Sequence, residues 1–124
     1  MQQTAERIRP PEDALAEAAE ACLSLVVICT TCAEICGPED GDMGDFVRAC
    51  LDCAESCTAA AMSALRRKDV LVEVVRRELG ICIETCRACI DLCASHGGDD
   101  GPCRVCAEEC RACLARCHAA VAAL

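Results

Sequence analysis

The chain has 124 residues, and 16 of them are cysteine, a fraction well above that of an ordinary core residue. It contains one phenylalanine and neither tyrosine nor tryptophan, and its formal net charge is -9. We therefore expect no nucleic-acid partner, because a single aromatic residue cannot build a surface for stacked bases and the acidic chain repels phosphates and attracts cations.

Helix start and stop signals first define two helices in the N-terminal half. The first helix is predicted over residues 11–36, since it begins at Pro10-Pro11 with acidic residues in its first turn and ends before Gly37. The second is predicted over residues 43–67. It follows an acidic loop, and Asp42 is placed to cap its first turn.

Two further helices are predicted in the C-terminal half, over residues 69–96 and 102–123. Asp69 is the expected cap of the third helix, which ends at Gly97, and Pro102 opens the fourth. No stretch shows the period-2 alternation of a strand. Because the connections are short, the sequence predicts an all-α fold, an antiparallel up-down-up-down four-helix bundle, with residues 1–124 as a single domain.

The cysteines repeat at helical spacing. Successive cysteines within each helix are 3, 4 or 7 residues apart, which confines them to one face of that helix. No charged residue shares these faces, although Leu25 and Phe46 interrupt the row of thiols. We therefore predict a core lined by cysteine, and we expect every cysteine to be a metal ligand: Cys22, Cys29, Cys32, Cys36, Cys50, Cys53, Cys57, Cys82, Cys86, Cys89, Cys93, Cys103, Cys106, Cys110, Cys113 and Cys117.

Antiparallel packing sorts the inward faces into two different ends. One end should be an apolar plug, beside a turn that holds Arg66, Arg67 and Lys68; its predicted members are Leu15, Ala18, Ala60, Ala64, Val72, Val75, Leu79, Ala120 and Leu124. The other end should be an open mouth between two acidic loops, residues 37–45 and 95–102, which attract cations.

Two further candidate ligands, Met43 and His96, are expected at this mouth. The alternative for Met43 is packing at the mouth, and for His96 an interaction with the helix dipole. His118 lies off the cysteine face of its helix and is expected at the surface.

Soft thiolates select Cu(I), Zn(II) or iron–sulfur clusters. Zinc bound by four thiolates carries a formal charge of about -2 per site, which is costly without a buried cation, and clusters need more room than a narrow bundle offers. Cu(I) shared between bridging thiolates is formally neutral, at about 16 ions for these cysteines. The alternatives are an iron–sulfur electron-transfer protein, a zinc-thiolate storage protein and a bundle stapled by disulfides.

The repeated C-x2-C and C-x3-C spacings from Cys22 to Cys117 resemble those of the four-helix-bundle copper storage proteins. The resemblance implies that the protein stores Cu(I) and is not an enzyme, that all the cysteines bind Cu(I), and that His96 and Met43 are entrance ligands. It also implies a homotetramer, and a copper chaperone is a candidate donor of the metal. Leu25 and Phe46 depart from a continuous thiol lining and affect the exact copper count.

The expected location is the cytoplasm, without a membrane partner. The first residues lack the basic and apolar regions of a signal peptide, and the uncharged run over residues 21–33 is shorter than the roughly 20 residues of a membrane span. The outer face of the first helix is less charged than the others. We predict that it contributes to an oligomer interface through Glu20, Ser24, Val27, Thr31 and Glu34.

Overall fold

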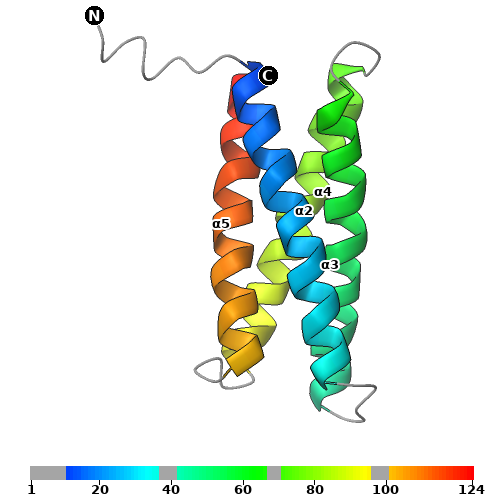
Figure 1. Ribbon diagram of the computed structural model, residues 1–124, viewed down its shortest axis with the longest axis vertical. Helices are drawn as coiled ribbons and strands as arrows, with labels where there is room; N and C mark the ends of the chain where they lie inside the picture. The colour runs from blue at the N-terminus through cyan, green and yellow to red at the C-terminus, as the bar shows by residue number, and fades with distance from the viewer. Residues whose placement is uncertain (1–10, 37–41, 67–70, 96–100) are drawn as a thin grey trace, which may run out of the picture.

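The computed structural model describes residues 11–36, 42–66, 71–95 and 101–124, except for the side chains of Pro11, Asp42, Met43 and residues 101–103. These residues form the helices α2 (Pro11–Cys36), α3 (Asp42–Leu65), α4 (Val72–Ser95) and α5 (Gly101–Ala123). The helices lie side by side, with α2 and α4 running in one direction and α3 and α5 in the other (Figure 1). The predicted antiparallel four-helix bundle is confirmed.

The helix ends follow local hydrogen bonding. The amide of Arg66 donates to the carbonyl of Ser63 at 3.3 Å, which closes α3 two residues before its predicted end. At the start of α4, the amides of Val74 and Val75 donate to the carbonyl of Leu71 at 2.9 and 3.2 Å. The predicted cap Asp69 lies outside the described residues.

Each helix packs against two neighbours, in the pairs α2 with α3, α3 with α4, α4 with α5 and α5 with α2. Within the described ranges, no Cα atom of α2 lies within 8 Å of a Cα atom of the diagonal helix α4, and the same holds for α3 and α5. The section of the bundle is therefore a square around one axis, and one face of every helix lines the same narrow interior.

The plugged end is apolar, as the sequence predicts. Its buried residues include Ala18, Ala60, Val75 and Leu79. The prediction that Val72 belongs to them is wrong, because half of its side chain is exposed. A helical side chain leans towards the turn that precedes it in the sequence. Because Val72 is the first residue of α4, no preceding turn of this helix covers its side chain.

Larger side chains complete the interior between the cysteines. Phe46 of α3 and Leu25 of α2 are 0% and 1% exposed. They fill the interruptions in the thiol rows with apolar volume, so these positions are packed rather than open.

Among the described residues, one helix is long and apolar enough to cross a membrane by length and composition, the segment Glu12–Cys36. Its inward side chains Cys22, Leu25 and Cys29 are buried in the bundle. Its outward side also carries apolar residues, since Leu23, Val27 and Ile35 are exposed. The unusual apolarity of α2 thus comes from two faces, and among the residues that the structure describes only the inward face is covered.

Candidate metal centre

The helical period aims the thiols inward. Every cysteine whose side chain the structure describes is buried, except Cys36, which is half-buried at the end of α2. None of these described cysteines forms a disulfide. The interior of the bundle is therefore lined by reduced sulfur along most of its length.

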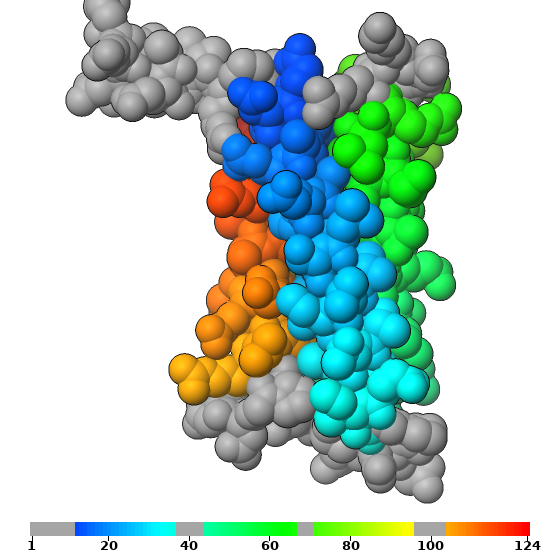
Figure 2. Space-filling model, viewed as in Figure 1, coloured from blue at the N-terminus to red at the C-terminus, as the bar shows by residue number. Residues whose placement is uncertain are grey.

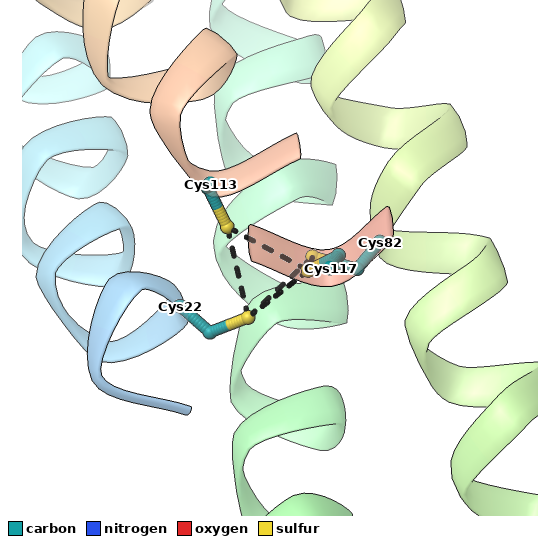
Figure 3. Close-up of side chains that lie close together, drawn as sticks. All are labelled: Cys22, Cys82, Cys113 and Cys117. Carbon is teal, nitrogen blue, oxygen red and sulfur yellow. Dashed lines mark hydrogen bonds between the residues drawn. The ribbon is translucent and has the colours of Figure 1, made fainter. Parts of the chain in front are cut away.

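Near the plugged end, four sulfurs from three helices form a compact tetrad (Figure 3), made by Cys22, Cys82, Cys113 and Cys117. The Sγ of Cys22 lies 3.7 Å from those of Cys82 and Cys113 and 3.8 Å from that of Cys117. The Sγ of Cys117 lies 3.9 Å from that of Cys82 and 4.0 Å from that of Cys113. One small ion can contact several of these sulfurs at once.

A second tetrad shares two of these sulfurs. It consists of Cys57, Cys82, Cys86 and Cys113, whose ligand atoms all lie within 4.8 Å of one another. The shortest contact joins α3 to α4, with 3.4 Å between the Sγ atoms of Cys57 and Cys82. Because Cys82 and Cys113 belong to both tetrads, ions bound in the two sets would share ligands.

Two more tetrads lie further along the helices, towards the predicted mouth, and they again overlap. One contains Cys29, Cys53, Cys89 and Cys110; the other contains Cys29, Cys50, Cys89 and Cys106. The Sγ of Cys106 lies 3.8 Å from that of Cys29 and 4.0 Å from that of Cys50. These contacts join α5 to both α2 and α3.

Cys53 connects the two halves of the interior. Its Sγ lies 3.8 Å from that of Cys86 and 4.0 Å from that of Cys57. The sulfurs therefore form one continuous column along the bundle axis, which we call the sulfur column: Cys22, Cys29, Cys50, Cys53, Cys57, Cys82, Cys86, Cys89, Cys106, Cys110, Cys113 and Cys117.

Protons are shared unevenly within the sulfur column. The hydrogen bond with Cys113 is the largest cause that raises the pKa of the Cys57 thiol far above its ordinary value of 9.0, and the bond with Cys106 does the same for the pKa of Cys110. Conversely, the hydrogen bond with Cys117 leads the contacts that lower the pKa of Cys113. Burial opposes ionisation at all three sulfurs. A metal ion that binds Cys57 or Cys110 therefore has to displace a tightly held proton.

The predicted mouth ligands are only partly covered by the structure. His96 and most of the two acidic loops lie outside the described residues, and so do the side chains of Met43 and Cys103. Cys32 and Cys93 are buried near the same end, and Cys36 is half-buried there. His118 is exposed, and its Nε2 lies 3.4 Å from a guanidinium nitrogen of Arg87, away from the sulfur column.

Sequence reasoning missed one polar contact beside the sulfurs. Ser56 of α3 and Thr85 of α4 bring their hydroxyl oxygens to 2.6 Å across the helix interface. A signal was present in the sequence, since each hydroxyl residue directly precedes a cysteine, Cys57 or Cys86. Nothing in the spacing indicated that the two would meet.

The chemistry of this column suits soft ions with filled d shells. The groups that it offers to a metal are thiols alone, and within the described residues no charged side chain is buried beside them. Sulfur separations of 3.4–4.0 Å allow one thiolate to bridge neighbouring ions. This geometry accommodates several thiophilic metals, so the choice among them needs a further observation.

A sequence model described as copper storage protein matches residues 11–122. This chain belongs to the copper storage protein family. Its function is accordingly the storage of copper, and membership implies a non-enzymatic role. The iron–sulfur and zinc alternatives are not favoured.

Solved structures of family members have the same fold. A cytosolic copper storage protein from Streptomyces lividans, determined with five coppers, is 39% identical, with a TM-score of 0.85 over 92% of this chain and 97% of that chain. The Streptomyces lividans protein loaded with 10 copper equivalents is 39% identical, with a TM-score of 0.84 over 90% of this chain and 86% of that one. A variant of that protein with two histidines replaced by alanine is 38% identical, with a TM-score of 0.83 over 90% and 96% of the two chains. No curated protein sequence matched.

Proposed function

We propose that this chain is a cytosolic Cu(I) store in which all the cysteines act as thiolate ligands, with a capacity of about 16 ions per chain. The continuous sulfur column supports this proposal most directly, because the sulfurs that two tetrads share, those of Cys29, Cys82, Cys89 and Cys113, can each serve two ions. The solved Streptomyces lividans relative is described as cytosolic and as loaded with copper. In this proposal the whole chain, residues 1–124, is one storage domain.

Charge supports Cu(I) over a divalent ion. A buried thiolate assembly with one Cu(I) per sulfur is formally neutral, whereas each tetrathiolate Zn(II) site leaves about two negative charges in a dry interior. The described part of the interior holds no lysine or arginine to balance them. Monovalent soft ions therefore fill the column at the lowest electrostatic cost.

Copper enters, in this proposal, at the end of the bundle where α2 ends and α5 begins. Met43, His96 and Cys103 belong to this end by their places in the sequence, and the loops there are acidic. A mouth with these residues would attract cations and pass them to the half-buried Cys36. Delivery by a copper chaperone fits such an entrance.

The proposed assembly is a homo-oligomer, a tetramer by family resemblance, that uses the outer face of α2. This face is uncovered along one side of the molecule (Figure 2). It exposes Leu23 and Val27, one helical turn apart, and 65% of Val27 is accessible. Neighbouring Ser24 and Thr31 are small enough for a close helix–helix approach.

We propose no catalytic activity. Among the described residues, no nucleophile, base and orienting group converge outside the sulfur column. The thiols themselves would be saturated by copper in the loaded state. Storage, rather than turnover, is the use that this interior allows.

The test is a titration of the reduced apo-protein with Cu(I) against a competing chelator, with metal counted per chain. We expect saturation at about 16 ions and a colourless product, since Cu(I) is d10. Protein whose thiols have been alkylated is the matched control and should bind none. Saturation at four ions or fewer, or a brown product with visible absorption, would contradict the proposal.

A further inference from the structure

A buried hydroxyl pair joins α3 to α4 beside the sulfur column. Ser56 is 9% exposed, and among the residues that the structure describes it is the one polar residue that is buried. Its Oγ lies 2.6 Å from Oγ1 of Thr85, which is half-buried on the facing helix. This contact is separate from every thiol of the proposed copper site.

Each hydroxyl also touches the carbonyl three residues earlier on its own helix. Ser56 Oγ lies 3.1 Å from the carbonyl oxygen of Cys53, and Thr85 Oγ1 lies 3.0 Å from that of Cys82. The two hydroxyl groups thus have two protons for three short oxygen–oxygen contacts, one with each carbonyl and one between the hydroxyls. At 2.6 Å, two oxygens need a proton between them, so one hydroxyl donates to its carbonyl and the other donates across the helix interface.

The pair lies in register with the sulfur contacts between the same two helices. Cys53 faces Cys86 at 3.8 Å, and Cys57 faces Cys82 at 3.4 Å. Ser56 immediately precedes Cys57, and Thr85 immediately precedes Cys86. An axial slip of one residue, about 1.5 Å, would separate the hydroxyls and change these sulfur spacings together.

Apolar packing specifies this register weakly. The buried faces of α3 consist largely of alanine and cysteine, as at Cys53, Ala54, Cys57, Ala60 and Ala61. Such small side chains form shallow ridges, and similar residues recur at each turn. A single polar contact in an apolar interface is a known means of fixing helix register.

We propose that Ser56 and Thr85 are a positioning pair that sets the register of α3 against α4, and thereby holds Cys53, Cys57, Cys82 and Cys86 at separations suited to bridging Cu(I). The inference rests on the proposed function, because it assigns these residues to copper binding through their effect on the thiols. Neither hydroxyl is a copper ligand in this proposal.

The experiment compares variants of the full chain in Cu(I) competition titrations with less copper than saturates the protein. In S56A and T85V, we expect the apparent affinity for Cu(I) to fall about two- to tenfold, which is the fold-change equivalent to one net hydrogen bond. T85S keeps the hydroxyl and should bind as the unaltered protein does. T58V is the matched control, because Thr58 Oγ1 donates only within α3, to the carbonyl of Ala54 at 2.8 Å.

Thermal unfolding of the apo-variants separates positioning from stability. The double variant S56A/T85V leaves no hydroxyl without a partner, so its apo-form should unfold near the temperature of the unaltered apo-protein while it still binds copper more weakly. Valine is nearly isosteric with threonine, so T85V still tests the proposal if S56A folds poorly.

Two outcomes are distinguishable. If the unaltered chain saturates near 16 ions and T85V competes for copper as T58V and T85S do, the positioning role is overturned. If the unaltered chain itself takes four ions or fewer, the proposed storage function fails, whatever the variants do.

Discussion

At the scale of single residues, the sulfurs of the column differ in how many neighbours they serve. Cys82 and Cys113 belong to two tetrads near the plugged end, whereas Cys22 and Cys117 belong to one. A sulfur with more partners can bridge more ions. The positions of the cysteines in the sequence do not reveal this difference, because all of them follow the same helical spacing.

We therefore expect C82S to lower the Cu(I) capacity more than C117S. A bridging thiolate accounts for about one ion on average, and a sulfur shared by two tetrads for about two. Metal counting after gel filtration of the loaded variants measures the difference. Equal losses from both variants would contradict the unequal sharing of sulfurs.

The pH dependence of copper binding follows from the same residues. Hydrogen bonding to neighbouring thiols, together with burial, raises the pKa of Cys57 and Cys110, so both sulfurs hold protons throughout the neutral range. Copper has to displace these protons, and binding therefore weakens as the pH falls. We expect the apparent affinity for ions bound by these two sulfurs to drop about tenfold per pH unit between pH 8 and pH 6, for one proton released per sulfur.

Competition titrations at several pH values, corrected for protonation of the chelator, measure this slope. A flat profile would mean that the column thiols are already ionised before copper arrives. Proton release recorded in weakly buffered solution gives an independent measurement of the number of protons that copper displaces.

At the scale of elements, α2 differs from the other helices because both of its sides carry apolar residues. The inward side packs Cys22 and Leu25 into the core, and the outward side exposes Leu23, Val27 and Ile35. A surface ion pair joins α2 to its neighbour α5, between Arg116 and Glu17 at 2.6 Å, but it does not involve these exposed apolar residues. The exposed side of α2 thus remains available to a second copy of the chain.

We expect V27E to dissociate the proposed oligomer. Val27 is 65% exposed within one chain, so the substitution leaves the fold of that chain intact, but it places a charge in an apolar interface. Sedimentation at micromolar concentration should show a smaller species than for the unaltered protein. V105E on α5, whose valine is 50% exposed, is the matched control; a monomeric unaltered protein would refute the interface.

At the scale of the whole molecule, the core of the bundle contains apolar side chains as well as cysteines. Phe46, Leu25, Leu79 and Val75 are fully buried, and alanines close the contacts between helices. Among the described residues, every buried polar side-chain atom has a hydrogen-bond partner. The apo-chain therefore has the packing and hydrogen bonding of a folded protein.

We expect the bundle to remain helical when copper is removed by a chelator, unlike small domains that fold only around a metal. Far-UV circular dichroism of the apo- and loaded forms should be similar, with a higher unfolding temperature for the loaded form because copper links four helices. Loss of helical signal on metal removal would contradict this expectation. F46A tests the core directly and should lower the apo-form's free energy of unfolding by about 3–5 kcal/mol.

The sequence by itself determined the helices, their antiparallel order and the inward direction of the thiols. These features follow from the period of a helix and from short connections, which act within a segment or between adjacent segments. Prediction was weaker at helix ends, as Val72 illustrates, because exposure there depends on what covers the first turn.

Only the tertiary structure decided which sulfurs meet. Spacing places Cys22 on one face of α2, but it does not reveal that this sulfur lies 3.7 Å from Cys82 on the diagonal helix. The same holds for Ser56 and Thr85, whose contact depends on the register of α3 against α4. Axial shift and rotation between helices arise from packing of the whole bundle, and no single segment of the chain carries that information.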